Sequence, residues 1–165
     1  MENRIGRSPV TWFVVAALLL VTLGFVASAL FGIGDSALDI AIHDSYIVIA
    51  HWHLVLITGL FCLGCAMVYW AFHHLFHRRL DGTLGLIHSA LTFIGLLGIF
   101  FPMHLIGAVG APRRYYDYTE FEPIEGAVRT VDLNMVVTGF ALLFLIGQSI
   151  LIVNVIRTLL RPPGA

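Results

Sequence analysis

Residues 46–72 read YIVIAHWHLVLITGLFCLGCAMVYWAF, a run that is long and apolar enough to cross a lipid bilayer as one helix. The hydrocarbon core of a bilayer is about 30 Å thick and needs about 20 apolar residues in helical conformation. Three further runs meet this requirement, at residues 10–33, 84–109 and 131–158. We therefore predict an all-α membrane protein, a four-transmembrane-helix bundle, with residues 1–165 forming one membrane domain.

The composition agrees with this fold class. Of the 165 residues, 59% are hydrophobic and 12% are charged, and the mean hydropathy is +0.92. Soluble domains carry about 25% charged residues, so this class of protein is excluded. We expect an integral protein of a bacterial or archaeal cytoplasmic membrane, surrounded by lipid and without a nucleic-acid partner.

The placement of arginine predicts the orientation in the membrane. The chain has no lysine, and arginines lie beside the first, second and fourth runs on one side of the membrane, at Arg4, Arg7, Arg78, Arg79, Arg157 and Arg161. Positively charged residues concentrate in cytoplasmic segments. We therefore predict that both termini are cytoplasmic.

Arg113 and Arg114 follow the third run and so lie on the opposite, outer face. One interpretation is a loop pair whose charge is balanced by nearby carboxylates. The other is a site for an anion, because arginine side chains bind carboxylates through two parallel hydrogen bonds. The residues alone leave both interpretations open.

Histidines lie at membrane depth, where a polar side chain is costly and marks a candidate functional site. Four of the eight histidines fall inside the predicted spans, at His51, His53, His88 and His104. The ordinary interpretation of a single such histidine is a hydrogen bond between helices, and this is what we expect for His88 and His104.

His51 and His53 form a different pattern. A helix turns about 100° per residue, so two positions apart the side chains point about 200° apart. The two imidazoles therefore cannot chelate one ion, but they can bind two separate centres, joined through Trp52. Imidazole is the usual proximal ligand of haem iron. We predict that His51 and His53 are haem-iron ligands.

A polar cluster is expected at the outer end of the same helix. His43 and Asp44 directly precede the second run, and Arg113 and Arg114 lie at the same membrane face. We call these four residues the collar. A haem held by His51 or His53 with its propionates facing outward would meet the collar.

Two longer motifs resemble a known family. DIAIHDSYIVIAHWHLVL at residues 39–56 and FFPMHLIGAVGAPRRYYDY at residues 100–118 are similar to signatures of subunit I of the haem-copper respiratory oxidases, the cytochrome c and quinol oxidases. The resemblance extends from about Trp12 into the fourth run and corresponds to the last four of that family's twelve helices.

The resemblance implies a role for each of these residues. His51 corresponds to the axial ligand of the high-spin haem, and His53 to one axial ligand of the low-spin haem. Arg113 and Arg114 correspond to the arginines that bind propionates. His43 and Asp44 correspond to residues near the propionates and a magnesium site, which makes them candidate magnesium ligands. The family has Phe where this chain has Trp52, so contact with the haems is expected to differ.

In that family the second ligand of the low-spin haem, the copper ligands and the proton channels lie on the first eight helices. The resemblance therefore implies that this chain is not a complete oxidase alone, and that copper is present only if a partner chain supplies its ligands.

Three functions stay open. The first is one piece of a split oxidase in a respiratory chain, which passes electrons to oxygen together with other oxidase-like chains. The second is a haem protein built from copies of this chain, for example a homotrimer, that transfers electrons or stores haem without reducing oxygen. The third is a haem-free assembly or structural subunit. The type of haem and the electron donor are not predicted.

Overall fold

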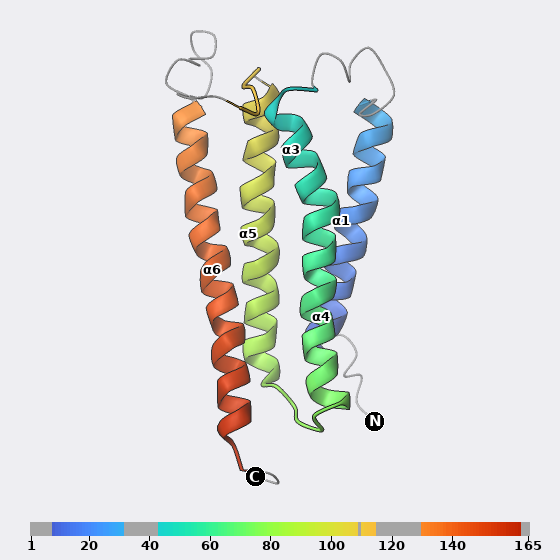
Figure 1. Ribbon diagram of the computed structural model, residues 1–165, viewed down its shortest axis with the longest axis vertical. Helices are drawn as coiled ribbons and strands as arrows, with labels where there is room; N and C mark the ends of the chain where they lie inside the picture. The colour runs from blue at the N-terminus through green and yellow to red at the C-terminus, as the bar shows by residue number, and fades with distance from the viewer. Residues whose placement is uncertain (1–7, 32–42, 109, 115–129, 163–165) are drawn as a thin grey trace.

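The computed structural model describes residues 8–31, 43–108, 110–114 and 130–162. Within them lie six helical segments, namely α1 (Pro9–Phe31), α3 (Tyr46–Trp52), η2 (His53–Ile57), α4 (Thr58–His74), α5 (Gly82–Ala108) and α6 (Thr130–Leu160). Since α3, η2 and α4 form one continuous rod, the described residues contain four spans (Figure 1). Each begins and ends within two residues of its predicted bounds, so the predicted fold class is confirmed.

The second span contains a π-helical turn that the hydropathy pattern does not predict. At η2 both the backbone N–H and the hydroxyl of Thr58 donate to the carbonyl of His53. The hydroxyl bond is 3.1 Å long. Single π turns inside α-helices are rare and often lie at functional sites. This turn begins at the second histidine of the His-x-His pair.

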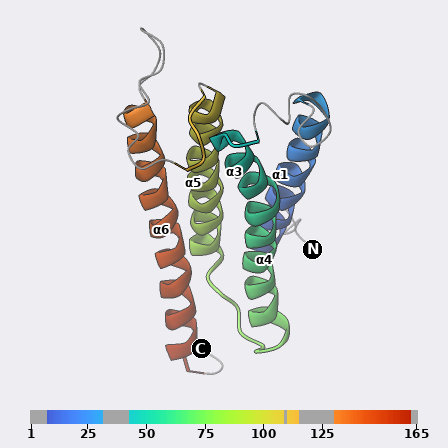
Figure 2. The same cartoon turned by 45° about the horizontal axis from the view of Figure 1, so that its top comes forward.

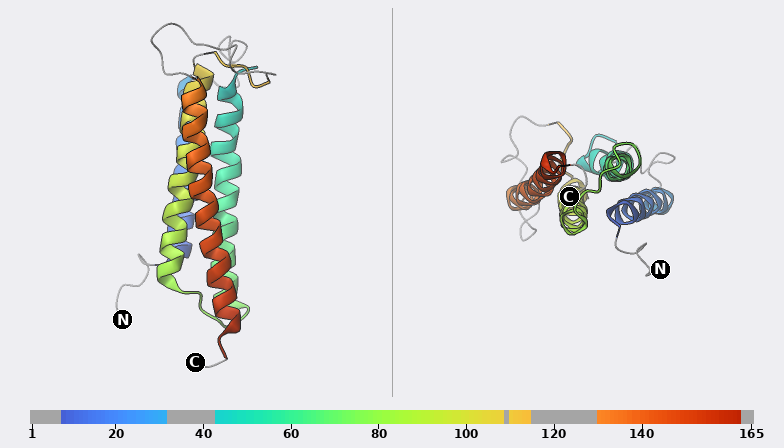
Figure 3. Two further views of the ribbon diagram at one scale, coloured as in Figure 1. Left: turned by 90° about the vertical axis from the view of Figure 1, so that its left-hand side faces the viewer. Right: turned by 90° about the horizontal axis from the view of Figure 1, so that it is seen from below.

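The four spans lie in a zigzag row. Seen from below, α6 and α1 occupy the two ends of the row, with α5 and α4 between them (Figure 3, right). The main contacts are accordingly α5 with α6, α1 with α4, and α3 with α5. The row arrangement leaves α6 the least covered span, with 6% of its residues buried against 39% for the second span.

Small residues allow close approach along the row. A Cβ atom at Gly98 of α5 would collide with the ring of Phe140 on α6, and one at Gly24 of α1 would collide with Val55 in η2. Membrane helices associate through such close contacts because lipid gives them little hydrophobic driving force. These glycines set the spacing of α5 from α6, and of α1 from the π turn.

Buried polar side chains also join the helices. The hydroxyl of Tyr69 donates to Nδ1 of His88 at 3.1 Å, and Nε2 of His88 donates to the side-chain oxygen of Gln148 at 3.2 Å. The Gln148 amide in turn donates to Thr92 at 2.9 Å. His88 thus connects α4, α5 and α6, and the expected interhelical hydrogen bond is present.

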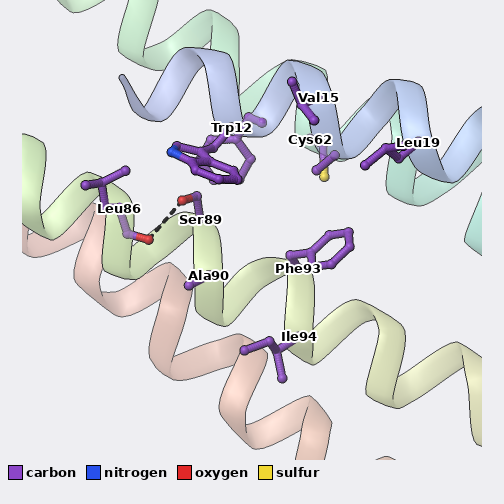
Figure 4. A pocket seen from close by; sticks show the side chains of 11 residues that line it. Trp12, Val15, Leu19, Cys62, Leu86, Ser89, Ala90, Phe93 and Ile94 are labelled. Carbon is purple, nitrogen blue, oxygen red and sulfur yellow. Dashed lines mark hydrogen bonds between the residues drawn. The ribbon is translucent and has the colours of Figure 1, made fainter. Parts of the chain in front are cut away.

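A groove between α1 and α5 is entirely uncharged. Its volume is about 550 Å³, and Cys62 of α4 lies at its inner side. The hydroxyl of Ser89 donates to the carbonyl of Leu86, so this polar lining group is satisfied within α5 (Figure 4). The groove presents apolar carbon atoms, as a surface facing lipid does.

Candidate cofactor site

His53 lies on the exposed side of its helix with one ring nitrogen fixed. Nδ1 donates to the backbone carbonyl of Ile49 at 2.8 Å. The neutral imidazole then carries its proton on Nδ1, which leaves the Nε2 lone pair available. Histidines that bind metals use this arrangement, because the hydrogen bond sets the tautomer and makes the ring a stronger ligand. The ring also lies beside Phe100 of α5, with 5.7 Å between the centroids.

His51 faces a different environment. Its side chain is 3% exposed, and a hydrogen bond of 2.6 Å joins its Nε2 to the hydroxyl of Ser28 on α1. Its ring contacts the edge of His104, with 6.1 Å between the centroids. The two imidazoles of the pair therefore have different neighbours, as the helical spacing predicts.

Trp52 and His104 complete the surroundings of the pair. Trp52 is 50% exposed, and its ring meets that of His51 edge to face. His104 donates through Nδ1 to the carbonyl of Phe100 at 2.7 Å. This bond lies within α5, so the hydrogen bond of His104 is not the interhelical one expected from the sequence. His104 follows Phe100 by four residues, which on a helix places its ring beside the Phe100 carbonyl, so the helix itself provides the acceptor.

Two of the four collar residues, Asp44 and Arg113, are bonded to each other. The Arg113 side chain lies 2.9 Å from the Asp44 carboxylate, and the Arg113 backbone N–H donates to the Asp44 carbonyl at 2.7 Å. Tyr46 likewise donates its N–H to Ala111 at 3.0 Å. The segment that follows α5 is therefore attached to the start of α3, at the end of the bundle that comes forward in Figure 2. Arg113 therefore has a carboxylate partner. This agrees with the first interpretation of the arginine pair, in which nearby carboxylates balance its charge.

His43 and Arg114 are exposed at this end of the bundle. A cavity of about 350 Å³ lies beside Asp44 and Ser45, between the start of α3 and the end of α5. Among the described residues, His43 and Asp44 are not joined by a third metal-ligating His, Cys, Asp or Glu side chain. A magnesium ion there would need water molecules as further ligands, which is common for this ion.

Sequence reasoning missed Ser28 and the π turn. A serine inside an apolar helix is a common residue that gives no signal of its partner. The π turn contains Val55, which lies against Gly24 of α1, and a hydropathy pattern shows neither the turn nor this contact.

These features describe a class of protein, a helical membrane protein. The imidazole of His53 has its Nδ1 bonded and its Nε2 outside that bond, and it lies within the rod that the collar residues His43 and Asp44 precede. Comparison with known proteins adds the family. The family described as Cytochrome C and Quinol oxidase polypeptide I matches residues 2–143. The chain belongs to this family, as the two sequence motifs indicate.

Several relatives are cytochrome c oxidase subunit 1 proteins. That of Corynebacterium diphtheriae is 35% identical over 151 residues, which is 88% of this chain and 24% of the relative. That of Thermostichus vulcanus is 42% identical over 104 residues, 61% of this chain and 19% of the relative. The alternative cytochrome c oxidase subunit 1 of Bradyrhizobium diazoefficiens is 29% identical over 147 residues. The chain spans about a quarter of the length of the Corynebacterium relatives.

Proposed function

We propose that this chain is a haem-binding electron-transfer protein of the membrane, and that it serves as one piece of a split terminal oxidase that passes electrons to oxygen. The observation that carries the proposal is the placement of His53, an exposed imidazole beside Phe100 whose Nδ1 is bonded to the carbonyl of Ile49, so that Nε2 is the nitrogen that would bind iron. Membership of the oxidase subunit I family supports haem as the ligand.

The residues fit a haem at His53. The ring is exposed on the helix surface, so a flat macrocycle has access to Nε2. Phe100 lies next to the ring and offers an apolar contact. When bound, the haem supplies one-electron redox chemistry, while the protein sets its position and electrostatic surroundings.

The collar is proposed to hold the haem propionates. Asp44 precedes His51 by seven positions, which corresponds to a helical rise of about 10 Å. The collar is therefore displaced along the helix axis from the two imidazoles, toward the membrane surface. Arg113 and Arg114 provide the positive charge that carboxylates need there, with Arg113 already oriented by Asp44.

His51 is proposed to bind a second haem on the other side of the helix. The covalent path between the two imidazoles runs through the single residue Trp52, so electrons would pass between two centres held on one rigid helix. The second axial ligand of the haem at His53, and the copper ligands of an oxygen-reducing centre, are proposed to come from a partner chain. The exposed apolar faces of the row, that of α6 above all, give a partner ample surface to pack against.

Purification of the full chain from its native membrane in mild detergent tests this function. The measurements are haem content by the pyridine haemochrome spectrum, copper by elemental analysis, and oxygen uptake with a reduced donor. The split oxidase predicts that haem, copper and a second oxidase-like polypeptide purify together with cyanide-sensitive oxygen uptake. Haem without copper or a second polypeptide would instead support the self-assembling haem protein, and neither metal would support a structural subunit.

A further inference from the structure

The backbone carbonyl of His53 accepts two hydrogen bonds from one residue. The backbone N–H of Thr58 donates to this carbonyl and closes the π turn, and the Thr58 hydroxyl donates to the same oxygen at 3.1 Å. Thr58 is fully buried, with 0% of its surface exposed. The hydroxyl bond is therefore shielded from solvent, and it lies directly on the residue that is proposed to bind iron.

The reach of the Thr58 hydroxyl differs from that of other hydroxyls in the spans. The hydroxyls of Thr138 and Ser149 on α6 each donate to the carbonyl four residues earlier, at 2.9 Å, which is the usual acceptor in an α-helix. The hydroxyl of Thr58 donates to the carbonyl five residues earlier. This bond therefore matches the register of the π turn, and an uninterrupted α-helix would bring a different carbonyl to the hydroxyl.

The place of the π turn decides the direction of the side chains that precede it. An α-helix turns about 100° per residue, and a π turn amounts to one extra residue in the helix. Residues before the turn are therefore rotated by about 100° relative to α4, compared with an uninterrupted α-helix. His53 is the first residue of the turn. A turn lying wholly before His53 would place its imidazole in the register of α4, rotated by about 100°.

Contacts on the other side of the turn define the present direction of the imidazole. Its Nδ1 donates to the carbonyl of Ile49 in α3 at 2.8 Å, and the ring lies beside Phe100 of α5, with 5.7 Å between the centroids. A rotation of about 100° would take the ring away from Phe100. The hydroxyl of Thr58 connects His53 to α4, and so it opposes a displacement of the turn.

We infer that Thr58 is a positioning residue whose buried hydroxyl keeps the π turn at residues 53–57 and thereby keeps the imidazole of His53 beside Phe100. Thr58 acts through the carbonyl of His53. One consequence rests on the proposed function, namely that a haem at His53 binds less tightly when the hydroxyl is absent. The placement of the imidazole itself is measurable without haem.

Two substitutions at Thr58 separate the hydroxyl from the shape of the side chain. Thr58→Val keeps the branched shape and loses the hydroxyl, whereas Thr58→Ser keeps the hydroxyl and loses a methyl group. A neutral hydrogen bond changes an equilibrium by about two- to twelvefold, so Thr58→Val should disfavour the turn at residues 53–57 by this factor. The control is Thr138→Val, which removes the hydroxyl of an exposed threonine that bonds within α6.

The first test is solid-state NMR of the full chain in lipid bilayers, with isotope-labelled histidine and phenylalanine. The cross peak between the rings of His53 and Phe100 is assigned by its loss in His53→Ala. We expect this cross peak to weaken in Thr58→Val and to persist in Thr58→Ser and Thr138→Val. An unchanged cross peak in Thr58→Val overturns the inference. Equal weakening in Thr58→Val and Thr58→Ser also overturns it, because the side-chain shape would then be what matters.

The second test titrates the same proteins in lipid nanodiscs with iron protoporphyrin IX and follows the part of the Soret band that is lost in His53→Ala. The apparent Kd should rise in Thr58→Val, by up to about twelvefold, and stay unchanged in Thr58→Ser and Thr138→Val. An unchanged Kd in Thr58→Val overturns the inference while haem binding at His53 stands. Absence of haem uptake in every protein overturns the proposed function, and the NMR cross peak then decides the role of Thr58 by itself.

Discussion

At the scale of residues, the hydrogen bonds of the ring nitrogens decide what each histidine can do. His88 uses both nitrogens, toward Tyr69 and Gln148, and so serves structure. His53 uses Nδ1, and its Nε2 is the nitrogen proposed to bind iron. His51 has Nε2 engaged by Ser28. The three histidines thus differ in which ring nitrogens are bonded, because their neighbours differ.

The collar gives a prediction at this scale. Arg113→Gln and Asp44→Asn both remove the ion pair, whose partners are 31% and 79% exposed, so each should cost less than about 1 kcal/mol of stability. Their effects on haem affinity should differ. Arg113→Gln removes a proposed partner of the propionates, whereas Asp44→Asn keeps Arg113 and releases it from its ion pair. Haem titration should show weaker binding in the first variant and unchanged or tighter binding in the second. Equal haem affinity in both variants would argue that Arg113 does not contact propionates.

At the scale of elements, the second span carries both proposed ligands, and its π turn begins at the second of them, His53. The turn places Val55 against Gly24 of α1, while α3 above it packs on α5. The span is thereby held from two sides just where the histidine pair lies. Ligands on such a supported helix keep their geometry better than ligands on loops.

Close packing of α5 on α6 predicts different effects of substitutions at two glycines. Gly98→Ala places a methyl group into the ring of Phe140, and overpacking of this kind costs about 1–3 kcal/mol. Gly139→Ala on α6 has no neighbour within 4 Å of the added atom and should be neutral or slightly stabilising, since Ala favours helix. Thermal unfolding in detergent measures both. Equal melting temperatures would show that the α5–α6 contact is looser than the structure has it.

Hydropathy predicts the elements well and the site only in part. The span bounds follow from the length of the apolar runs. The contact of Asp44 with Arg113 follows from the number of spans between them, because the start of the second span and the end of the third lie at the same membrane face. The Ser28–His51 bond depends on which side chains of two helices touch, and the π turn has no signature in the hydropathy pattern. The His104 bond within its own helix was missed because a lone histidine gives no sign of its acceptor.

At the scale of the whole molecule, the spans form a row rather than a closed bundle. Helices α6 and α1 lie at the two ends of the row (Figure 3), and both carry exposed apolar side chains, which lipid or further helices of an oxidase would cover. The histidine pair lies at the α3 end, away from the end where α1 begins and α6 finishes (Figure 1). Both termini of the described bundle therefore lie opposite the proposed haem site.

The buried polar network gives a prediction for the cohesion of the row. His88 links α4 to α6 through Tyr69 and Gln148, and hydrogen bonds between membrane helices contribute about 0.6 kcal/mol on average and at most about 1.7 kcal/mol. A double-mutant cycle of His88→Ala and Gln148→Ala should give a coupling free energy in this range. Unfolding in a denaturing detergent measures it. Strict additivity of the two substitutions would mean that the bond adds nothing to stability.

The most direct test of the account is the Soret absorbance of the purified full chain carrying His53→Ala, compared with His74→Ala. His74 is the matched control, because it is exposed on the same span and donates Nδ1 to Trp70 in the same way, at 3.0 Å. If His53 holds one of the proposed haems, His53→Ala should weaken the binding of that haem on the order of tenfold or more and so lower the haem content, whereas His74→Ala should leave it unchanged. Equal haem content in the two variants would contradict the account.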